Sequence, residues 1–416
     1  MANPIPLSVD TWLLRKIHDS IGRAPVRFVL AENGASWPPA GDAPIQVTLA
    51  NRRTLAGLVF NPEVSFGDAY SDGRIEVRGD LVRLIEFVFR SQTIAGRQPW
   101  LSRLWDWWLD RVQANTLEGS RSNIHSHYDL NANFYKLWLD AQMVYTCAYF
   151  PEPSVPLEEA QVAKMEHVCR KLRLRPDETV VEAGCGWGAL ALWMASHYGV
   201  KVRSFNISRE QVAFARERAR QEGLSDRIEF VEDDYRNISG RYDAFVSVGM
   251  LEHVGLENYE DFGAVIHRAI GNSGRGLLHF IGKNWPRPFS PWIRKRIFPG
   301  AYAPSLRQVM DIFEPRNFSV LDVENLRFHY ARTLEHWLTR FDRSSNKIAS
   351  MFGHEFVRAW RLYLAGSIAS FRVGTLQLFQ VLFAGSECRQ IPWTRAYVYS
   401  DDRREEKQDA WVQSAS

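Results

Sequence analysis

A glycine-rich turn at residues 180–188 is the first feature of this 416-residue chain that could do chemistry. Val180 and Val181 are typical of a buried strand, which would end at an acid and lead through the turn into a helix. Glycine lets backbone lie against a ligand, and parallel sheets bind ligands where their strands end. The spacing excludes a Walker loop and the full dinucleotide fingerprint. The candidate ligand contacts are Glu182, Gly184, Cys185, Gly186, Trp187 and Gly188.

Polar side chains follow the next two predicted strands. VKVRSFN ends at Asn206, and Gln211 lies at the start of the next helix, so both are suited to ribose hydroxyls. RIEFVEDD ends in Asp234, and Tyr235 and Arg236 follow it. The acid of Asp234 and the flat ring of Tyr235 are suited to an adenine. These three strand ends together are the layout of an S-adenosylmethionine methyltransferase. They outweigh the alternative in which Asp234 and Tyr235 only terminate a strand.

The elements that must position these groups are short β-like runs separated at first by helices. The runs are TVVEAG, VKVRSFN, RIEFVEDD, YDAFVSVGM and GLLHFIG, with helices expected over 187–197 and 208–222. This alternation predicts an α/β fold of the class I methyltransferase type, a doubly wound and mostly parallel sheet. We assign it residues 131–400, with helical lid insertions, and expect helical stretches over 335–352 and 356–382.

Residues 1–97 are expected to form a small α+β domain. Its alternating segments IQVTLA and TLAGLVF are predicted to be strands separated by tight turns. A helical linker at 98–130 and a polar tail at 401–416 complete the predicted organisation.

Composition excludes several classes of protein. There are 51 Lys+Arg against 48 Asp+Glu, and a net charge of +3 argues against nucleic acid as a partner held by bulk charge. No apolar run reaches the length of a spanning helix, and the N-terminus lacks a secretory signal. The four cysteines lack the spacing of a zinc site or disulfide framework, so no metal is predicted. We expect a cytoplasmic protein.

Longer motifs resemble the cyclopropane-fatty-acyl-phospholipid synthase family, which includes the mycolic acid cyclopropane synthases. In the family's order they are SHYDLNANFYKLWLD with MVYTCAYF, EAGCGWGALA, SVGMLEHVG, LLHFIGKN, PWIRKRIFPG, FHYARTLEHW and ASFRVGTLQLFQVLF. GDAYSDGRIEVRGDL also resembles the family's N-terminal domain, which is similar to sterol-carrier-like lipid folds. The resemblance implies transfer of a methylene from S-adenosylmethionine to the cis double bond of an unsaturated phospholipid acyl chain.

The resemblance also implies roles for single residues. Ring closure needs a base, which in the family is a bicarbonate held by residues matching Glu252, His279, Tyr330 and backbone near Cys147. Tyr145 and Thr146 would contact the methionine part of the cofactor, Asn206 and Gln211 the ribose, and Tyr235 and Arg236 the adenine.

Simpler interpretations of the anion-site residues stay open. His279 could be a satisfied core histidine, and Glu252 and Tyr330 could be capping or interface groups. For Glu252 the residues themselves favour function, since an acid within the apolar GMLEHVG is costly to bury unless it is employed. Ser367 replaces a cysteine found in many relatives. We therefore assign it to the substrate pocket without a covalent role.

A basic, aromatic and acid-free segment, WPRPFSPWIRKRIFPG, is the predicted contact with the bilayer. Trp292, Arg294, Lys295 and Arg296 are its candidate residues, and the equally weighted alternative is that its aromatic rings pack on their own domain. The interpretation makes the protein a peripheral enzyme on the inner face of the cell membrane. Relatives are often dimeric, so a homodimer is expected by analogy only.

Two alternative functions remain. One is a fatty-acyl C-methyltransferase that makes methyl- or methylene-branched chains. The other is a non-catalytic lipid carrier, which the intact GCGWG turn and the complete anion-site set argue against.

Overall fold

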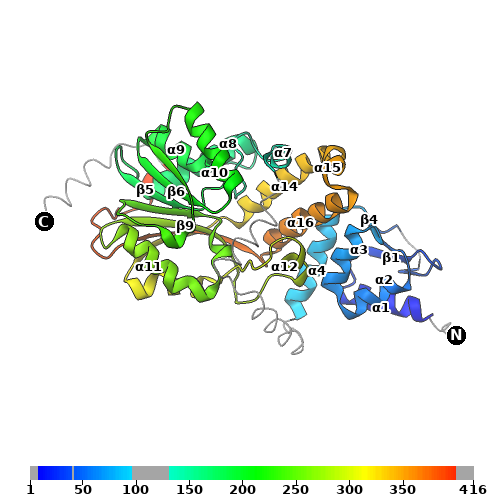
Figure 1. Ribbon diagram of the computed structural model, residues 1–416. Helices are drawn as coiled ribbons and strands as arrows, with labels where there is room; N and C mark the ends of the chain where they lie inside the picture. Colours follow the sequence, from blue (N-terminus) through cyan, green and yellow to red (C-terminus); the bar gives the residue numbers. More distant parts are fainter. Residues whose placement is uncertain (1–7, 40–41, 96–130, 400–416) are drawn as a thin grey trace. The chain divides into compact units, whose positions relative to one another are not determined.

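The structure, a computed structural model, describes residues 8–39, 42–95 and 131–399 (Figure 1). The predicted linker at 98–130 and the tail at 401–416 lie outside these residues. The chain divides into two compact units. The N-terminal unit comprises Met1–Val112, Phe289–Pro299 and Ala331–Leu376. The sheet unit comprises Gln113–Pro288, Gly300–Tyr330 and Gln377–Ser416.

The sheet unit contains a seven-stranded sheet in the order β10-β11-β9-β8-β5-β6-β7. Within this order the strands β9, β8, β5, β6 and β7 each pair in parallel with the next. Strand β11 is antiparallel to both β9 and β10. This confirms the predicted doubly wound α/β fold. The strands are β5 (Thr179–Ala183), β6 (Lys201–Asn206), β7 (Ile228–Glu232), β8 (Ala244–Val248), β9 (Arg275–Gly282), β10 (Ser319–Asn325) and β11 (Gln377–Ala384).

Helices cover both faces of this sheet (Figure 1). Val180 faces one hydrophobic core and Val181, the next residue, faces the other, because successive side chains of a strand alternate. The first core includes residues of α8 (Leu157–Leu172), α9 (Ala189–Tyr198) and α10 (Arg209–Gln221). The second includes residues of α11 (Tyr259–Ile270) and α13 (Leu306–Phe313). The short helix α7 (Ala132–Tyr135) begins the described part of the unit.

The N-terminal unit is also α+β, with a four-stranded sheet in the order β2-β1-β3-β4. Its strands are β1 (Val26–Leu30), β2 (Ser36–Trp37), β3 (Ile45–Leu49) and β4 (Ile75–Arg78). Its first helices are α1 (Val9–Ser20), α2 (Arg52–Phe60), α3 (Pro62–Ser71) and α4 (Leu81–Ala95). Later helices α12 (Pro291–Arg296), α15 (Ser345–Phe352) and α16 (His354–Val373) join them, with most of α14 (Arg327–Arg343).

The division differs from the predicted domain boundaries, because segments 289–299 and 331–376 group with the N-terminal residues. Arg358 on α16 shows why: its guanidinium donates to the carbonyls of Tyr70 (2.5 Å) and Ile75 (2.7 Å). Arg372 also pairs with Glu86 of α4 at 3.0 Å. The long C-terminal helix therefore satisfies its basic side chains on the N-terminal part of the chain.

Two predicted elements were wrong. TLAGLVF is helix α2, not a strand: the side chain of Asn51 caps it by accepting from the Thr54 amide at 2.9 Å. The predicted helix over 356–382 ends at Val373, and Gly374 (φ 86°) turns the chain into strand β11. Every residue of β11 is buried, so it lacks the alternation by which a half-exposed strand is recognised.

Among the described helices, none is both long and apolar enough to cross a bilayer.

Candidate active site

The glycine turn after β5 leaves the main chain accessible at one position, Gly186. Gly184, Gly186 and Gly188 have φ values of 90°, 51° and 87°, a region that glycine enters without steric cost. A Cβ at Gly188 would lie 2.7 Å from the Cβ of Ala215, so this glycine permits close packing. A Cβ at Gly186 would meet nothing within 4 Å. Gly186 is thus the point at which a ligand could approach the main chain.

Residues from three predicted positions meet around this turn. The Asn206 amide donates to Gln211 Oε1 at 2.8 Å and to the carbonyl of Gly186 at 3.3 Å. Glu182 is buried and accepts from Ser204 Oγ, and burial raises its pKa to about 7. Burial also raises the pKa of Cys185 to about 12, which makes its thiol unreactive.

The residues after β7 have their own local partners. Asp234 is buried and its side chain accepts from the backbone amide of Arg236 (2.9 Å) and from the Arg236 guanidinium (3.2 Å). It thereby caps the 3-10 turn Tyr235–Asn237 that follows the strand. Tyr235 packs edge-on against Phe262, and its buried hydroxyl has no hydrogen-bond partner among the described residues. Burial raises its pKa to about 12.

An aromatic cluster borders the turn. Trp187 is buried and its ring centroid lies 5.7 Å from that of Tyr135, which in turn lies 5.3 Å from Tyr145. Trp138 lies 5.3 Å from Tyr145 and 5.6 Å from Tyr135. Tyr135 and Trp138 were not among the predicted site residues. Their signal was the motif NFYKLWLD, in which Tyr135 and Trp138 stand three apart as on one helical face.

Helix α8 holds the segment that contains Tyr145 and Thr146. Gln161 donates to the carbonyl of Thr146 at 2.9 Å, and Lys164 Nζ donates to the Thr146 hydroxyl at 3.3 Å. Lys164 is buried, and desolvation lowers its pKa to about 8. Cys147, the next residue, is fully buried and donates its thiol hydrogen to the carbonyl of Ala148. Sequence reasoning missed Lys164.

His279 lies on strand β9, and Glu252 accepts a hydrogen bond from the same strand. Glu252 lies in the 3-10 turn Leu251–His253, just after β8, and its Oε1 accepts from the amide of Ile281 at 2.6 Å. Ile281 is two residues beyond His279 on the same strand. His279 Nδ1 contacts Gln380 Nε2 at 3.1 Å. Tyr330, in the first turn of α14, is buried in the same unit.

Each of these two groups keeps one polar atom unsatisfied. Glu252 Oε2 and His279 Nε2 are buried without a hydrogen-bond partner in the described part of the chain. Burial raises the pKa of Glu252 to about 7, so the carboxyl holds its proton near neutrality. Burial also lowers the pKa of His279 to about 3, so its ring is neutral. Buried polar atoms are rarely left unpaired, so both atoms are available to a bound water or ligand.

The predicted membrane contact is partly wrong. Trp292 is only 4% exposed and lies against Gly67 of α3, where an added Cβ would be 2.3 Å from its ring. Arg294 is 5% exposed, and Arg296 pairs with Asp68 at 3.0 Å. Helix α12 packs on its own unit, which was the alternative interpretation. Lys295 is exposed.

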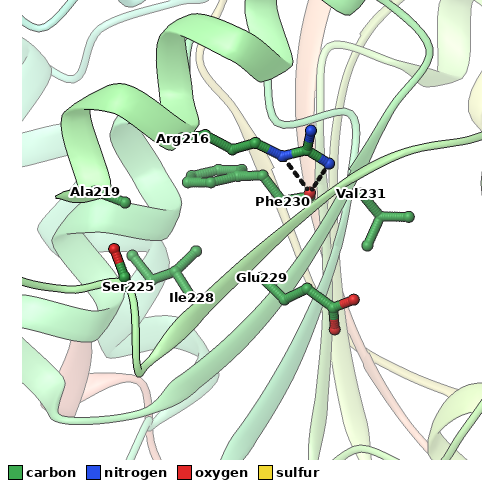
Figure 2. A pocket seen from close by; sticks show the side chains of 7 residues that line it. All are labelled: Arg216, Ala219, Ser225, Ile228, Glu229, Phe230 and Val231. Atoms are coloured by element: carbon green, nitrogen blue, oxygen red, sulfur yellow. Dashed lines mark hydrogen bonds between the residues drawn. The ribbon is translucent and has the colours of Figure 1, made fainter.

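Ser367, the predicted pocket residue, is half-buried on α16 and belongs to the N-terminal unit. Figure 2 shows a hollow elsewhere, beside the edge strand β7. There the Arg216 guanidinium donates to the carbonyl of Phe230 at 2.7 and 3.0 Å. This contact satisfies an edge carbonyl, and the hollow contains none of the predicted site residues.

Comparison with known proteins assigns the chain to a family. Residues 115–381 match the family model described as mycolic acid cyclopropane synthetase. The chain belongs to this family. It is accordingly an enzyme of the methyltransferase class, as the motifs predicted.

Relatives of this family member differ in their named activities. It is 35% identical to a probable fatty acid methyltransferase of Pseudomonas putida, over 86% of this chain and 93% of the relative. It is 41% identical to the cyclopropane-fatty-acyl-phospholipid synthase of Escherichia coli (strain K12), over 62% of this chain and 66% of the relative.

Solved structures agree on the fold. A cyclopropane synthase from Mycobacterium tuberculosis aligns with a TM-score of 0.61 and 29% identity, covering 64% of this chain and 98% of the other. Coclaurine N-methyltransferase aligns with a TM-score of 0.65, and at 22% identity it shows the shared fold alone.

The raised pKa of Glu252 predicts a pH-dependent stability. The fold favours the protonated carboxyl. The contribution of Glu252 to the free energy of unfolding is therefore complete below its ordinary pKa and is lost as the pH rises through about 7. Glu252→Gln keeps an acceptor for the Ile281 amide but has no proton to lose. Between about pH 5 and pH 8 the free energy of unfolding should fall more in the wild type than in the variant, by on the order of 2 kcal/mol.

Urea unfolding at both pH values measures this difference, with the exposed Glu260→Gln as the matched control. Equal pH slopes for the wild type and Glu252→Gln would contradict the assignment.

Proposed function

We propose that this enzyme uses S-adenosylmethionine to convert the cis double bond of an unsaturated phospholipid acyl chain into a cyclopropane. The observation that carries the proposal is the pair of unsatisfied buried atoms, Glu252 Oε2 and His279 Nε2. A simple methyl transfer to a heteroatom needs no such site, whereas ring closure requires removal of a proton from the transferred carbon. The Escherichia coli relative named for this reaction supports the choice of substrate.

The residues around the glycine turn fit S-adenosylmethionine. Gly186 leaves backbone open to a ligand, and the amides of Asn206 and Gln211 can bond to ribose hydroxyls. The rings of Trp187, Tyr135 and Tyr145 offer aromatic faces, which attract a cation. When bound, the cofactor supplies a methyl group activated by its sulfonium. The surrounding protein aligns the reactants and excludes water.

The unsatisfied pair fits a bicarbonate, which would supply the base. Glu252 can donate its retained proton, because a pKa of about 7 keeps much of it protonated near neutrality and avoids repulsion between two anions. His279 is neutral and can donate one N–H. The Tyr330 hydroxyl and backbone near Cys147 would complete the site.

A second candidate function is fatty-acyl C-methylation, which gives a branched chain. The Pseudomonas putida relative, matched over 93% of its length, favours it. The two reactions share their first step, attack of the alkene on the methyl group, and differ in how the resulting cation loses a proton. A base held between Glu252 and His279 favours ring closure.

Mass spectrometry of lipids from cells that express the protein distinguishes the candidates. We expect acyl chains that gain one CH₂ and no longer react as alkenes, which indicates a ring. A gain of one CH₂ with a surviving alkene would indicate the branched product. Unchanged lipids would indicate a carrier and contradict both reactions.

Glu252→Gln should retain cofactor affinity and lose at least about a hundredfold in turnover, since a positioned proton-transfer group commonly contributes that much. Calorimetric titration with S-adenosylhomocysteine and a radiolabelled methyl-transfer assay measure the two effects. Glu260→Gln should match the wild type in both. Near-normal turnover in Glu252→Gln would refute the anion site.

Membrane association is part of the proposal, because the acyl chain of a phospholipid lies in a bilayer. Trp285 in the sheet unit is 48% exposed, with the Arg287 guanidinium 5.7 Å from its ring centroid. Lys295 supplies an exposed cation in the N-terminal unit. Aromatic rings lie at headgroup depth, and one basic residue contributes about 1 kcal/mol near an anionic surface.

Trp285→Ala and Lys295→Glu should each lower binding to vesicles that contain anionic phospholipid by roughly fivefold or more, with thermal stability unchanged. Arg294→Gln should instead lower the thermal stability, because Arg294 is buried. Vesicle sedimentation and thermal unfolding measure these effects. Wild-type vesicle binding by both exposed variants would contradict both proposed membrane contacts.

A further inference from the structure

Gln380 forms a side-chain hydrogen bond with His279, and the sheet places it there. β11 and β9 are antiparallel, and Gln380 is the register partner of His279. Gln380 is fully buried, and its Nε2 lies 3.1 Å from His279 Nδ1. The contact thus depends on strand register, not on the placement of a loop.

The hydrogen bond from the Gln380 amide nitrogen determines which nitrogen of the His279 ring carries the proton. A side-chain amide nitrogen has only hydrogens to offer, so Gln380 donates and His279 Nδ1 accepts. A neutral imidazole carries one N–H, which must then be on Nε2. This is the buried atom without a hydrogen-bond partner in the described part of the chain.

The hydrogen bond from Gln380 can decide which ring nitrogen carries the proton only because His279 is neutral. A doubly protonated ring would donate from both nitrogens whatever Gln380 did. Burial prevents that charge and lowers the pKa of His279 to about 3, and the nearby Lys164 and Lys171 act in the same direction. Glu324 opposes them, and His167 acts with the lysines. With one proton available, the group that bonds to Nδ1 decides what Nε2 can do.

We propose that Gln380 is a positioning residue that sets the tautomer of His279, so that Nε2–H is offered as a donor to the anion. The inference rests on the proposed function. The opposite tautomer would carry its hydrogen on Nδ1 and present a lone pair at Nε2, which would repel an anion. Gln380 therefore acts through His279 without itself touching the reacting atoms.

The same strand supplies a matched control. Gln377 is also buried on β11, and its side chain accepts from the Asn325 amide at 2.8 Å. Gln377→Leu and Gln380→Leu each remove one buried amide from the same strand. Only the second removes the hydrogen bond to His279.

Nitrogen NMR of the full-length protein labelled at histidine tests the tautomer directly. The His279 signals are those missing from the spectrum of His279→Gln. In the wild type we expect Nδ1 without a proton and Nε2 with one. Gln380→Leu should give a mixture of tautomers, and Gln377→Leu should match the wild type. A proton on Nδ1 in the wild type would overturn the inference, and this measurement needs no variant at Gln380 to fold.

Turnover as a function of added bicarbonate tests the consequence. Gln380→Leu should raise the half-saturating bicarbonate concentration about tenfold, the factor for one net hydrogen bond. The KM for S-adenosylmethionine should not change, and Gln377→Leu should change neither quantity. Gln380→Met is a second variant of similar volume, with the same expectation.

The two hypotheses fail in different ways. If Gln380→Leu keeps both the wild-type tautomer and the wild-type bicarbonate response, Gln380 does not position His279. If the Gln380-dependent tautomer is observed while wild-type turnover ignores bicarbonate, the tautomer inference stands. In that case the proposed base is refuted.

Discussion

Strand β9 lies between β8 and β11, and hydrogen bonds on its two sides bring the central groups of the candidate site together. On one side Gly249 donates to the carbonyl of His279 at 2.8 Å, and the Ile281 amide donates to Glu252. On the other side the antiparallel register sets Gln380 opposite His279. A shift of one residue in either pairing would turn these side chains to the opposite face of the sheet. The site therefore depends on the pairing of β9 more than on any loop.

Desolvation then determines the charge of each group. Glu182 and Glu252 are both buried with pKa values raised to about 7, while His279 is held neutral. Neutral groups are cheaper to bury than ions, so the fold tolerates several ionisable side chains within one region. The same effect brings the pKa values of the two carboxyls near neutral pH, where a group can both hold and release a proton. Desolvation thus determines both how these groups affect the stability of the fold and which protons they carry near neutral pH.

The sequence predicted the sheet and the glycine turn because parallel strands bring their carboxyl ends to one edge, where Asn206 and Gln211 indeed meet the backbone of Gly186. It could not predict the contact of Gln380 with His279. A strand buried on both faces has no alternation, and its apolar run continues that of the preceding helix. The burial of Trp292 was equally inaccessible, since composition does not say which face of a short helix packs inward.

Two lysines on helix α8 show how far local pairing decides the role of a buried charge. Lys171 contacts Glu324 at 2.6 Å and Asp322 at 3.4 Å, so its charge is neutralised by two acids of β10. Lys164 stands two turns earlier, and its one hydrogen bond with a described residue is to the Thr146 hydroxyl. Desolvation therefore prevails at Lys164 and lowers its pKa to about 8. With a pKa of about 8, Lys164 is still mostly protonated at neutral pH, so it donates to the Thr146 hydroxyl while its positive charge disfavours protonation of His279.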